Sequence, residues 1–218
     1  MKLLQQMVTD ERLVRLSHSL SEGLNRVGDL AGGERRRKRN RAAFDRFHDT
    51  GLLNGQSLGI LGQMPYGGYT MDYNGCEVIA CCNALRLLGR NVALGDVAAY
   101  FERHGIFLGG LWGTHAAEIP RYFTRLGFKP ETLYASAVRG SAQYDDALAK
   151  ARAGVFSFWN DAKRLRSGVH TVALTATERG LTVYNLDCGD PKENTAYRSI
   201  SDWMQHSRIL PILLVTLP

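Results

Sequence analysis

The sequence predicts an α+β fold in which helices come first and an antiparallel sheet follows. Up to about residue 152, apolar residues recur every three or four positions and several of these segments end at glycine, which is typical of amphipathic helices. From Val155 onward, apolar and polar residues alternate, and Glu178–Gly180 separates two alternating runs as a hairpin turn does. Because the two kinds of element are not interleaved, we expect a helical layer packed on a separate sheet rather than βαβ units.

The boundaries of the elements follow from the same patterns and from end signals. Helices are expected at residues 3–30 (one or two), 76–88, 94–103, 114–126, 143–152 and 199–205, and strands at 155–159, 169–174, 181–186 and 209–217. Gly89 ends the helix before it, and Thr114 caps the start of another, in which Pro120 should cause a kink or a restart. Residues 52–73 are rich in Gly, Tyr and Asn and are expected to form a loop.

The positive charge of the chain is concentrated in one short run. The 218 residues carry a formal net charge of +6, and residues 35–41 alone contribute six positive charges. Such a run can bind nucleic acid, a membrane surface or an acidic partner, but a solvated linker is the commoner reason for it. Nucleic acid is disfavoured because the rest of the chain lacks a stripe of basic and aromatic residues. We therefore expect a helical appendage and basic linker at 1–41, which binds a partner or covers the main domain's groove, and a main domain at 42–218.

The N-terminal segment has no export or membrane signal. Asp10, Glu11 and Arg12 interrupt it before an apolar stretch of signal-peptide length develops. No segment approaches the length of a membrane-spanning helix. We expect a cytoplasmic protein, and export by a signal-independent route stays open.

Three of the four cysteines lie in the stretch YNGCEVIACCNALRLLG, residues 73–89. The chain has no CxxC pair, so a zinc site has no support, and no cofactor is expected. On a helix that begins at Cys76, Cys81 lies about 140° away and Cys82 about 120° away in the other direction, so the three thiols do not converge on one ion. Cys81 and Cys82 fall among apolar core positions and should be small buried hydrophobes, and Cys188 should be an inert turn thiol.

Cys76 has the context of a nucleophile. It opens a helix after a glycine-rich loop, and a helix N-terminus lowers the pKa of a thiol. Gly75 allows a tight turn there, and the free amides of the first turn can face an oxyanion. The alternative is an ordinary cysteine at a helix start.

A thiolate nucleophile needs a base, and the base needs an orienting group. His170 opens an alternating strand, where it would be held rigidly without being buried. Asn185 near the end of the hairpin-paired strand, or Asp187 after it, would orient the imidazole. The alternative is that His170 packs across strands and Asn185 ends its strand in a turn. The other histidines are expected in the appendage or on the surface: His18, His48, His104, His115 and His206.

The order of these parts resembles the papain-like cysteine peptidases, and in finer detail the bacteriocin-leader (double-glycine) peptidases and their uncharacterised bacterial relatives. The resemblance covers residues 62–217 and is carried by YNGCEVIACCNALRLLG, GLWGTHAAEIPRYFTRLGFKPETLYA, AGVFSFWN, GVHTVALTATERGLTVYNLD and SISDWM. It implies a papain-like fold with Cys76 as nucleophile and His170 as base. Asn185 or Asp187 would orient that base.

The chain departs from this family just before and after the nucleophile. The family places a Gln a few residues before the Cys, whereas Gln63 lies thirteen positions upstream of Cys76. A loop that returns Gln63, or the side chain of Asn74 beside Gly75, would then supply the oxyanion donor. Glu77 would oppose a thiolate if its carboxylate pointed inward.

These residues favour a cysteine peptidase that cleaves a peptide amide, with a leader peptide as one substrate. An acyltransferase or amidase with the same triad uses the same residues, so the sequence does not separate it from a peptidase. The missing Gln also keeps open a catalytically decayed peptide-binding module.

Overall fold

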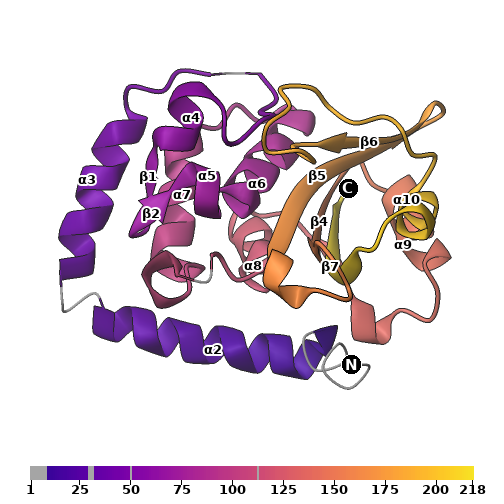
Figure 1. The fold of residues 1–218 in the computed structure, drawn as a ribbon, viewed down its shortest axis with the longest axis horizontal. Helices are drawn as coiled ribbons and strands as arrows, with labels where there is room; N and C mark the ends of the chain where they lie inside the picture. The colour runs from indigo at the N-terminus through magenta and orange to yellow at the C-terminus, as the bar shows by residue number, and fades with distance from the viewer. Residues whose placement is uncertain (1–8, 29–31, 50, 112) are drawn as a thin grey trace.

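The computed structural model describes residues 9–28, 32–49, 51–111 and 113–218. Within these residues the chain has the expected α+β order, with helices first and an antiparallel sheet of five strands after them. Figure 1 shows the helices α3 to α7 on one side of the sheet and α9 and α10 on the other side, with α2 along the bottom of the view. No helix in the described residues is long and apolar enough to cross a membrane.

The sheet has the strand order β3-β7-β4-β5-β6, and every neighbouring pair is antiparallel. Its strands are β3 (Glu131–Tyr134), β4 (Ala153–Trp159), β5 (Val169–Thr177), β6 (Gly180–Tyr184) and β7 (Leu210–Leu217). Four of them were expected, and β3 was not. Pro211 is tolerated in β7 because β3 pairs only with the residues from Leu213 onward. No β3 residue therefore needs a hydrogen bond from the N–H that proline lacks.

The helices that precede the sheet are α2 (Glu11–Gly28), α3 (Glu34–Phe44), α4 (Gly59–Gln63), α5 (Met71–Asn74), α6 (Cys76–Leu87), α7 (Leu94–His104) and α8 (Glu118–Arg125). Two helices follow β3 and β6, namely α9 (Ala142–Ala149) and α10 (Ile200–His206). Gly89 and Gly127 lie just past α6 and α8 with φ of 76° and 86°, which is the left-handed conformation that ends a helix. The prediction that a glycine ends each of these two helices is therefore confirmed.

Three expectations about this part of the chain are wrong. The loop at 52–73 contains α4, α5 and a short hairpin of β1 (Pro65–Tyr66) with β2 (Tyr69–Thr70). Thr114 does not cap a helix, because it forms an isolated β-bridge with Ile106 and α8 begins only at Glu118. Pro120 therefore interrupts no helix and lies in the first turn of α8, where its missing N–H has no intrahelical partner to lose.

The basic run is helix α3, not a linker, and the helix continues through the expected boundary at residue 41. Arg and Lys are good helix formers, so a run of them favours a helix once its inner face has contacts. Asn40 provides one contact, because its amide donates to the Gly67 carbonyl over 2.9 Å and to Glu102 Oε1 over 2.5 Å. Phe44, the last residue of the helix, is buried one turn further along.

The core lies on both faces of the sheet. Val155 and Val215 belong to the core on the side of α6, whereas Phe156, Val172 and Leu214 belong to the core on the side of α9 and α10. Each residue of β4 is buried except Trp159 at its end, which is why this strand reads as an apolar run without alternation. Helix α6 lies against β5 and β4, and this contact brings the cysteine stretch to the hairpin-paired strands.

Candidate active site

Cys76 is the first residue of α6, directly after the short helix α5. The chain passes so closely here that a Cβ atom at Gly75 would lie 2.5 Å from the Met71 carbonyl oxygen. Only glycine fits this join between the two helices. The sequence therefore located the start of α6 correctly, and the glycine is needed for the close approach.

The Cys76 thiol is nearly covered and is bonded to its neighbour in the chain. Its side chain is 7 % exposed, and Sγ donates to Glu77 Oε2 over 3.0 Å. Burial raises the pKa of this thiol well above its ordinary value, and the charge of Glu77 raises it further, whereas a hydrogen bond from the Thr171 backbone lowers it. The expectation of a lowered pKa is wrong, because burial and a facing carboxylate outweigh the helix N-terminus.

The carboxylate of Glu77 points inward, which is the orientation in which it was expected to oppose a thiolate. Its carboxyl group is buried between α6 and β5, and burial raises its pKa to about 7. Hydrogen bonds from Cys76 and from the Thr171 side chain act in the opposite direction. The Thr171 hydroxyl also lies 2.9 Å from that of Ser157, so a polar chain runs from β4 through β5 to the nucleophile.

His170 is held by a backbone carbonyl. Its Nε2 lies 2.7 Å from the Asn185 oxygen, and because a carbonyl only accepts, Nε2 carries the hydrogen and donates. The ring meets the Phe158 ring edge-on at 5.9 Å. Burial lowers the pKa of His170, so the neutral imidazole with Nδ1 as its basic nitrogen is favoured. The residue is 7 % exposed, so the expectation that it is not buried is wrong.

The structure brings Cys76 to the backbone beside His170 but does not join the two side chains. Successive residues of a strand point to opposite faces, so Thr171 faces α6 while His170 faces Phe158. The thiol contacts the Thr171 backbone and bonds to Glu77. The thiol and the imidazole therefore lie toward opposite faces of β5, and a hydrogen bond between them requires His170 to leave Phe158 and turn around the start of the strand.

Asn185 orients His170 through its backbone and not through its side chain. It has a φ of 61°, a left-handed conformation that asparagine tolerates better than most residues. Its side chain is occupied elsewhere, accepting from the Gln56 N–H and donating to Gln56 Oε1, both over 3.0 Å. Asp187 is exposed and caps its own turn at the Gly189 N–H, although its charge raises the pKa of His170.

Gln56 is a buried residue of this site that the sequence reasoning missed. Its side-chain amide donates to the carbonyls of Met71, over 3.0 Å, and Asp72, over 2.8 Å. Gln56 thus ties the turn after β6 to the helix that precedes the nucleophile. Gln63, in contrast, is exposed at the end of α4. Since both amide hydrogens of Gln56 are used and Gln63 faces solvent, neither stands as a free oxyanion donor in this arrangement.

Asn74 is the buried amide that remains free near Cys76, the candidate nucleophile. It is 2 % exposed, and neither Nδ2 nor Oδ1 has a hydrogen-bond partner among the described residues. A Cβ atom at Gly110 would lie 2.6 Å from Nδ2, so the glycine turn η2 (Leu108–Gly110) closes over this amide. An unpaired buried donor two residues before Cys76 is the arrangement that an oxyanion stabiliser requires.

An exposed aromatic surface lies in the chain just ahead of the nucleophile. Tyr69 and Tyr73 stack with their ring centroids 5.0 Å apart and are both exposed. The Tyr73 hydroxyl donates to the carbonyl of Leu111, itself exposed, over 3.4 Å. Aromatic rings with one polar end are well suited to hold a peptide.

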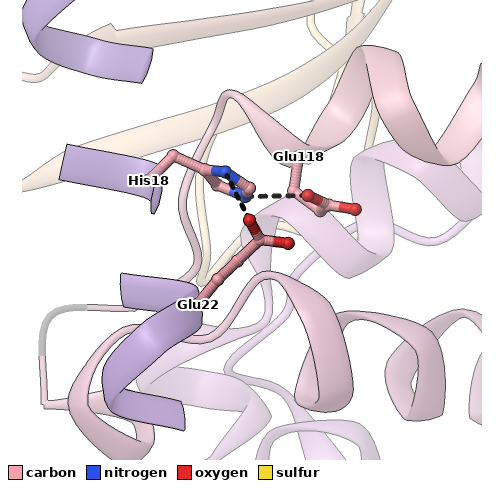
Figure 2. Close-up of side chains that lie close together, drawn as sticks. All are labelled: His18, Glu22 and Glu118. Atoms are coloured by element: carbon pink, nitrogen blue, oxygen red, sulfur yellow. Dashed lines mark ion pairs between the residues drawn. The ribbon is translucent and has the colours of Figure 1, made fainter. Parts of the chain in front are cut away.

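A second cluster of titratable groups, His18, Glu22 and Glu118, joins α2 to α8 (Figure 2). His18 Nε2 lies 2.7 Å from Glu118 Oε2, although at an angle that is not that of a hydrogen bond. Two ligands of one tetrahedral zinc ion would lie about 3.3 Å apart. Arg121 Nη1 lies 3.3 Å from Glu22 and 3.8 Å from Glu118, bridging the two carboxylates. The arrangement is therefore an ion-pair cluster that fastens α2 to the body.

The remaining histidines are only partly where they were expected. His48 and His206 are exposed, as expected. His18 is buried in the contact with α8, and His115 is half-buried, with Nε2 2.8 Å from the Ser17 hydroxyl. Burial, together with the neighbouring His18, lowers the pKa of His115 to about 3. Residue spacing carries no signal for such contacts, because they join parts of the chain about a hundred residues apart.

No protein-family model, curated protein or solved structure matches this chain.

Proposed function

We propose that the chain is a papain-like cysteine peptidase that cleaves a peptide amide with Cys76 as nucleophile and His170 as base. The observation that carries the proposal is the meeting of α6 and β5. The thiol at the helix start touches the Thr171 backbone, and the imidazole of His170, the preceding residue of the strand, is held by a carbonyl at Nε2 with Nδ1 left as the base. A positioned thiol, base and orienting group are the parts of a nucleophilic amide-cleaving site.

The proposed reaction begins when His170, at the start of β5, turns to the α6 side of the strand and the Cys76 thiol, released from Glu77, gives its proton to Nδ1. The sulfur then attacks the carbonyl carbon of the scissile amide. His170 passes the proton to the leaving amine, which leaves a thioester on Cys76. Water, deprotonated by His170, hydrolyses the thioester and restores the thiol.

The Asn74 amide is proposed as the donor to the oxyanion that forms during attack. It is unpaired, buried and two residues from the nucleophile. Losing one such donor lowers kcat by about 10²–10³-fold in well-studied amide-cleaving enzymes. Asn74→Ala should therefore reduce turnover much more than it reduces substrate binding.

The test is incubation with a mixture of synthetic peptides, read by mass spectrometry. We expect cleavage by the wild type, none by Cys76→Ala or His170→Ala, and retained cleavage by Cys81→Ala, whose thiol is fully buried in the core. Products with a free carboxylate indicate hydrolysis, whereas products joined to an added amine indicate acyl transfer. Binding of peptides without cleavage by the wild type would instead support the decayed binding module.

A further inference from the structure

Helix α2 turns an apolar face to solvent. At about 100° per residue, its large apolar side chains fall within about 40° on either side of Leu20 and form one continuous stripe. Their exposed fractions lie between 39 and 66 %, and the residues are Leu13, Leu16, Leu20, Leu24 and Val27. Single exposed apolar residues are ordinary, but a contiguous stripe of this kind marks an interaction site.

The face of α2 that touches the body is largely polar, and its contacts are specific. His18 lies against Glu118, and the side chains of Ser21 and Asn25 both donate to the Ile106 carbonyl. His18 and Ser21 are almost fully buried. The helix cannot turn its apolar stripe inward without leaving these polar atoms unpaired, which is costly in a buried site. The outward direction of the stripe is therefore built into the docking of α2.

Positive charge flanks the stripe. Arg12 and Arg26 lie about 80° and 120° from its centre, on the side away from the body. Helix α3 follows directly, carries six cationic residues, and exposes Arg35, Lys38 and Arg39. Figure 1 shows α2 and α3 as two consecutive outer edges of the molecule. An apolar helix face beside a cationic helix complements an anionic, partly apolar surface.

The stripe is poorly suited to a partner helix. A coiled coil has two core positions in each seven-residue repeat. On α2 the first would be filled by Leu13, Leu20 and Val27. The second would be filled by Leu16, and seven residues later it falls on Gly23. No atom lies within 4 Å of a Cβ placed at Gly23, so packing does not require a glycine there. The gap would leave a hole in a coiled coil, whereas fluid acyl chains fill it without a matching side chain.

We propose that α2 and α3 form a docking surface for an anionic lipid membrane. The 18 residues of α2 would lie flat, with the leucine stripe at the boundary between head groups and acyl chains. The cations of α3 would meet the lipid phosphates. This function is independent of the chemistry at Cys76, and it would hold the peptidase site at the membrane surface.

The test is co-sedimentation of the full chain with phosphatidylcholine vesicles, with and without phosphatidylglycerol. We expect binding to the anionic vesicles that weakens as salt is added. The double change Leu16→Ser and Leu20→Ser should lower the partition coefficient at least about tenfold, because two inserted side chains are lost. Ile60→Ser, which changes a side chain more exposed than either leucine but outside α2, should leave binding unchanged. Lys38→Glu should weaken binding to the anionic vesicles.

Three results would overturn the proposal. The first is failure of the wild type to sediment with anionic vesicles, and the second is equal sedimentation of the double leucine variant. The third is a wild type that is dimeric by light scattering and a leucine variant that is monomeric, which would identify the stripe as a contact between two copies of the chain. Circular dichroism of each variant checks that the fold is retained, as expected for exposed positions.

Discussion

Glu77→Gln should make Cys76 more reactive at neutral pH. In the wild type the thiol gives its hydrogen bond to Glu77, and the carboxylate opposes the loss of that proton. Glutamine keeps nearly the same size and removes the charge. Its amide can also donate to a thiolate, which a carboxylate cannot do. The variant therefore favours the form of Cys76 that reacts with electrophiles.

The separation of the two groups sets the size of the effect. Two full charges at the observed 3.0 Å would repel by about 5.5 kcal/mol at an effective dielectric constant of about 20. If only a quarter of that energy, about 1.4 kcal/mol, is released, the thiolate population rises tenfold. Alkylation follows the thiolate. We therefore expect Cys76 to be labelled by iodoacetamide at least about tenfold faster at pH 8 in the variant, where the wild-type carboxylate is charged.

The assay is labelling against pH, read by peptide mass spectrometry for each cysteine separately. Glu102→Gln is the matched control, since Glu102 is also a buried glutamate but bonds to Asn40 and Gly67 instead of to the thiol. An unchanged rate in a folded Glu77→Gln protein would refute the electrostatic reasoning. A slower rate would mean that Glu77 accepts the thiol proton and acts as the base itself.

The same substitution should change how stability depends on pH. The folded-state pKa of Glu77 is raised to about 7 from an ordinary 4.5, so the folded protein holds this proton more tightly than the unfolded chain. The stabilisation is complete below pH 4.5 and is lost as pH rises through 7. The loss amounts to about 3 kcal/mol at 1.36 kcal/mol per unit. Urea unfolding should show that the free energy of unfolding of Glu77→Gln rises relative to that of the wild type between pH 5 and pH 8. If the two free energies changed in parallel with pH, the reasoning would be contradicted.

Four further substitutions separate structural from chemical roles. Asn83→Ala should destabilise the protein by about 2–4 kcal/mol, because its buried amide bonds both the N–H and the carbonyl of Leu53, each over 2.7 Å; a thermal shift below a few degrees would argue against it. Gln56→Ala should raise amide hydrogen exchange at the turn after β6, and exchange confined to residue 56 would contradict its tying role. Cys81→Ser should lower the free energy of unfolding by about 1–3 kcal/mol, because it buries a hydroxyl without a partner. Cys82→Ala should lower it by less, and chemical denaturation of the two variants measures the difference.

Local signals account for the parts of the fold that were predicted. Gly75 and Gly89 mark both ends of α6, and strong alternation marks β5 and β6. The strand β3 was missed because its four residues, ETLY, form a strand only through pairing with β7 about eighty residues later. The run at residues 35–41 was interpreted as a linker from its charge, and its helical state depends on long-range contacts such as that of Asn40 with Glu102.

The candidate site, too, was predicted only in those parts that have a local signal in the sequence. Cys76 and His170 could be selected from their positions at the start of a helix and of a strand. The burial of the Glu77 carboxylate depends on how α6 meets β5, which no spacing in the sequence reveals. The role of Asn185 was anticipated for its side chain, but its left-handed backbone presents the carbonyl to His170 and leaves the side chain to Gln56.

The burial of the cysteines affects how inhibitors of the proposed peptidase should be sought. Cys81 and Cys82 are fully buried and Cys76 nearly so, which leaves the half-buried Cys188 as the thiol most open to reagents. Cys188 is also near enough to Cys76 for its charge to raise the pKa of that thiol. A compound that alkylates Cys188 would crowd the candidate nucleophile and imitate a true inhibitor. A chemical screen therefore needs a Cys188→Ser protein as its starting material.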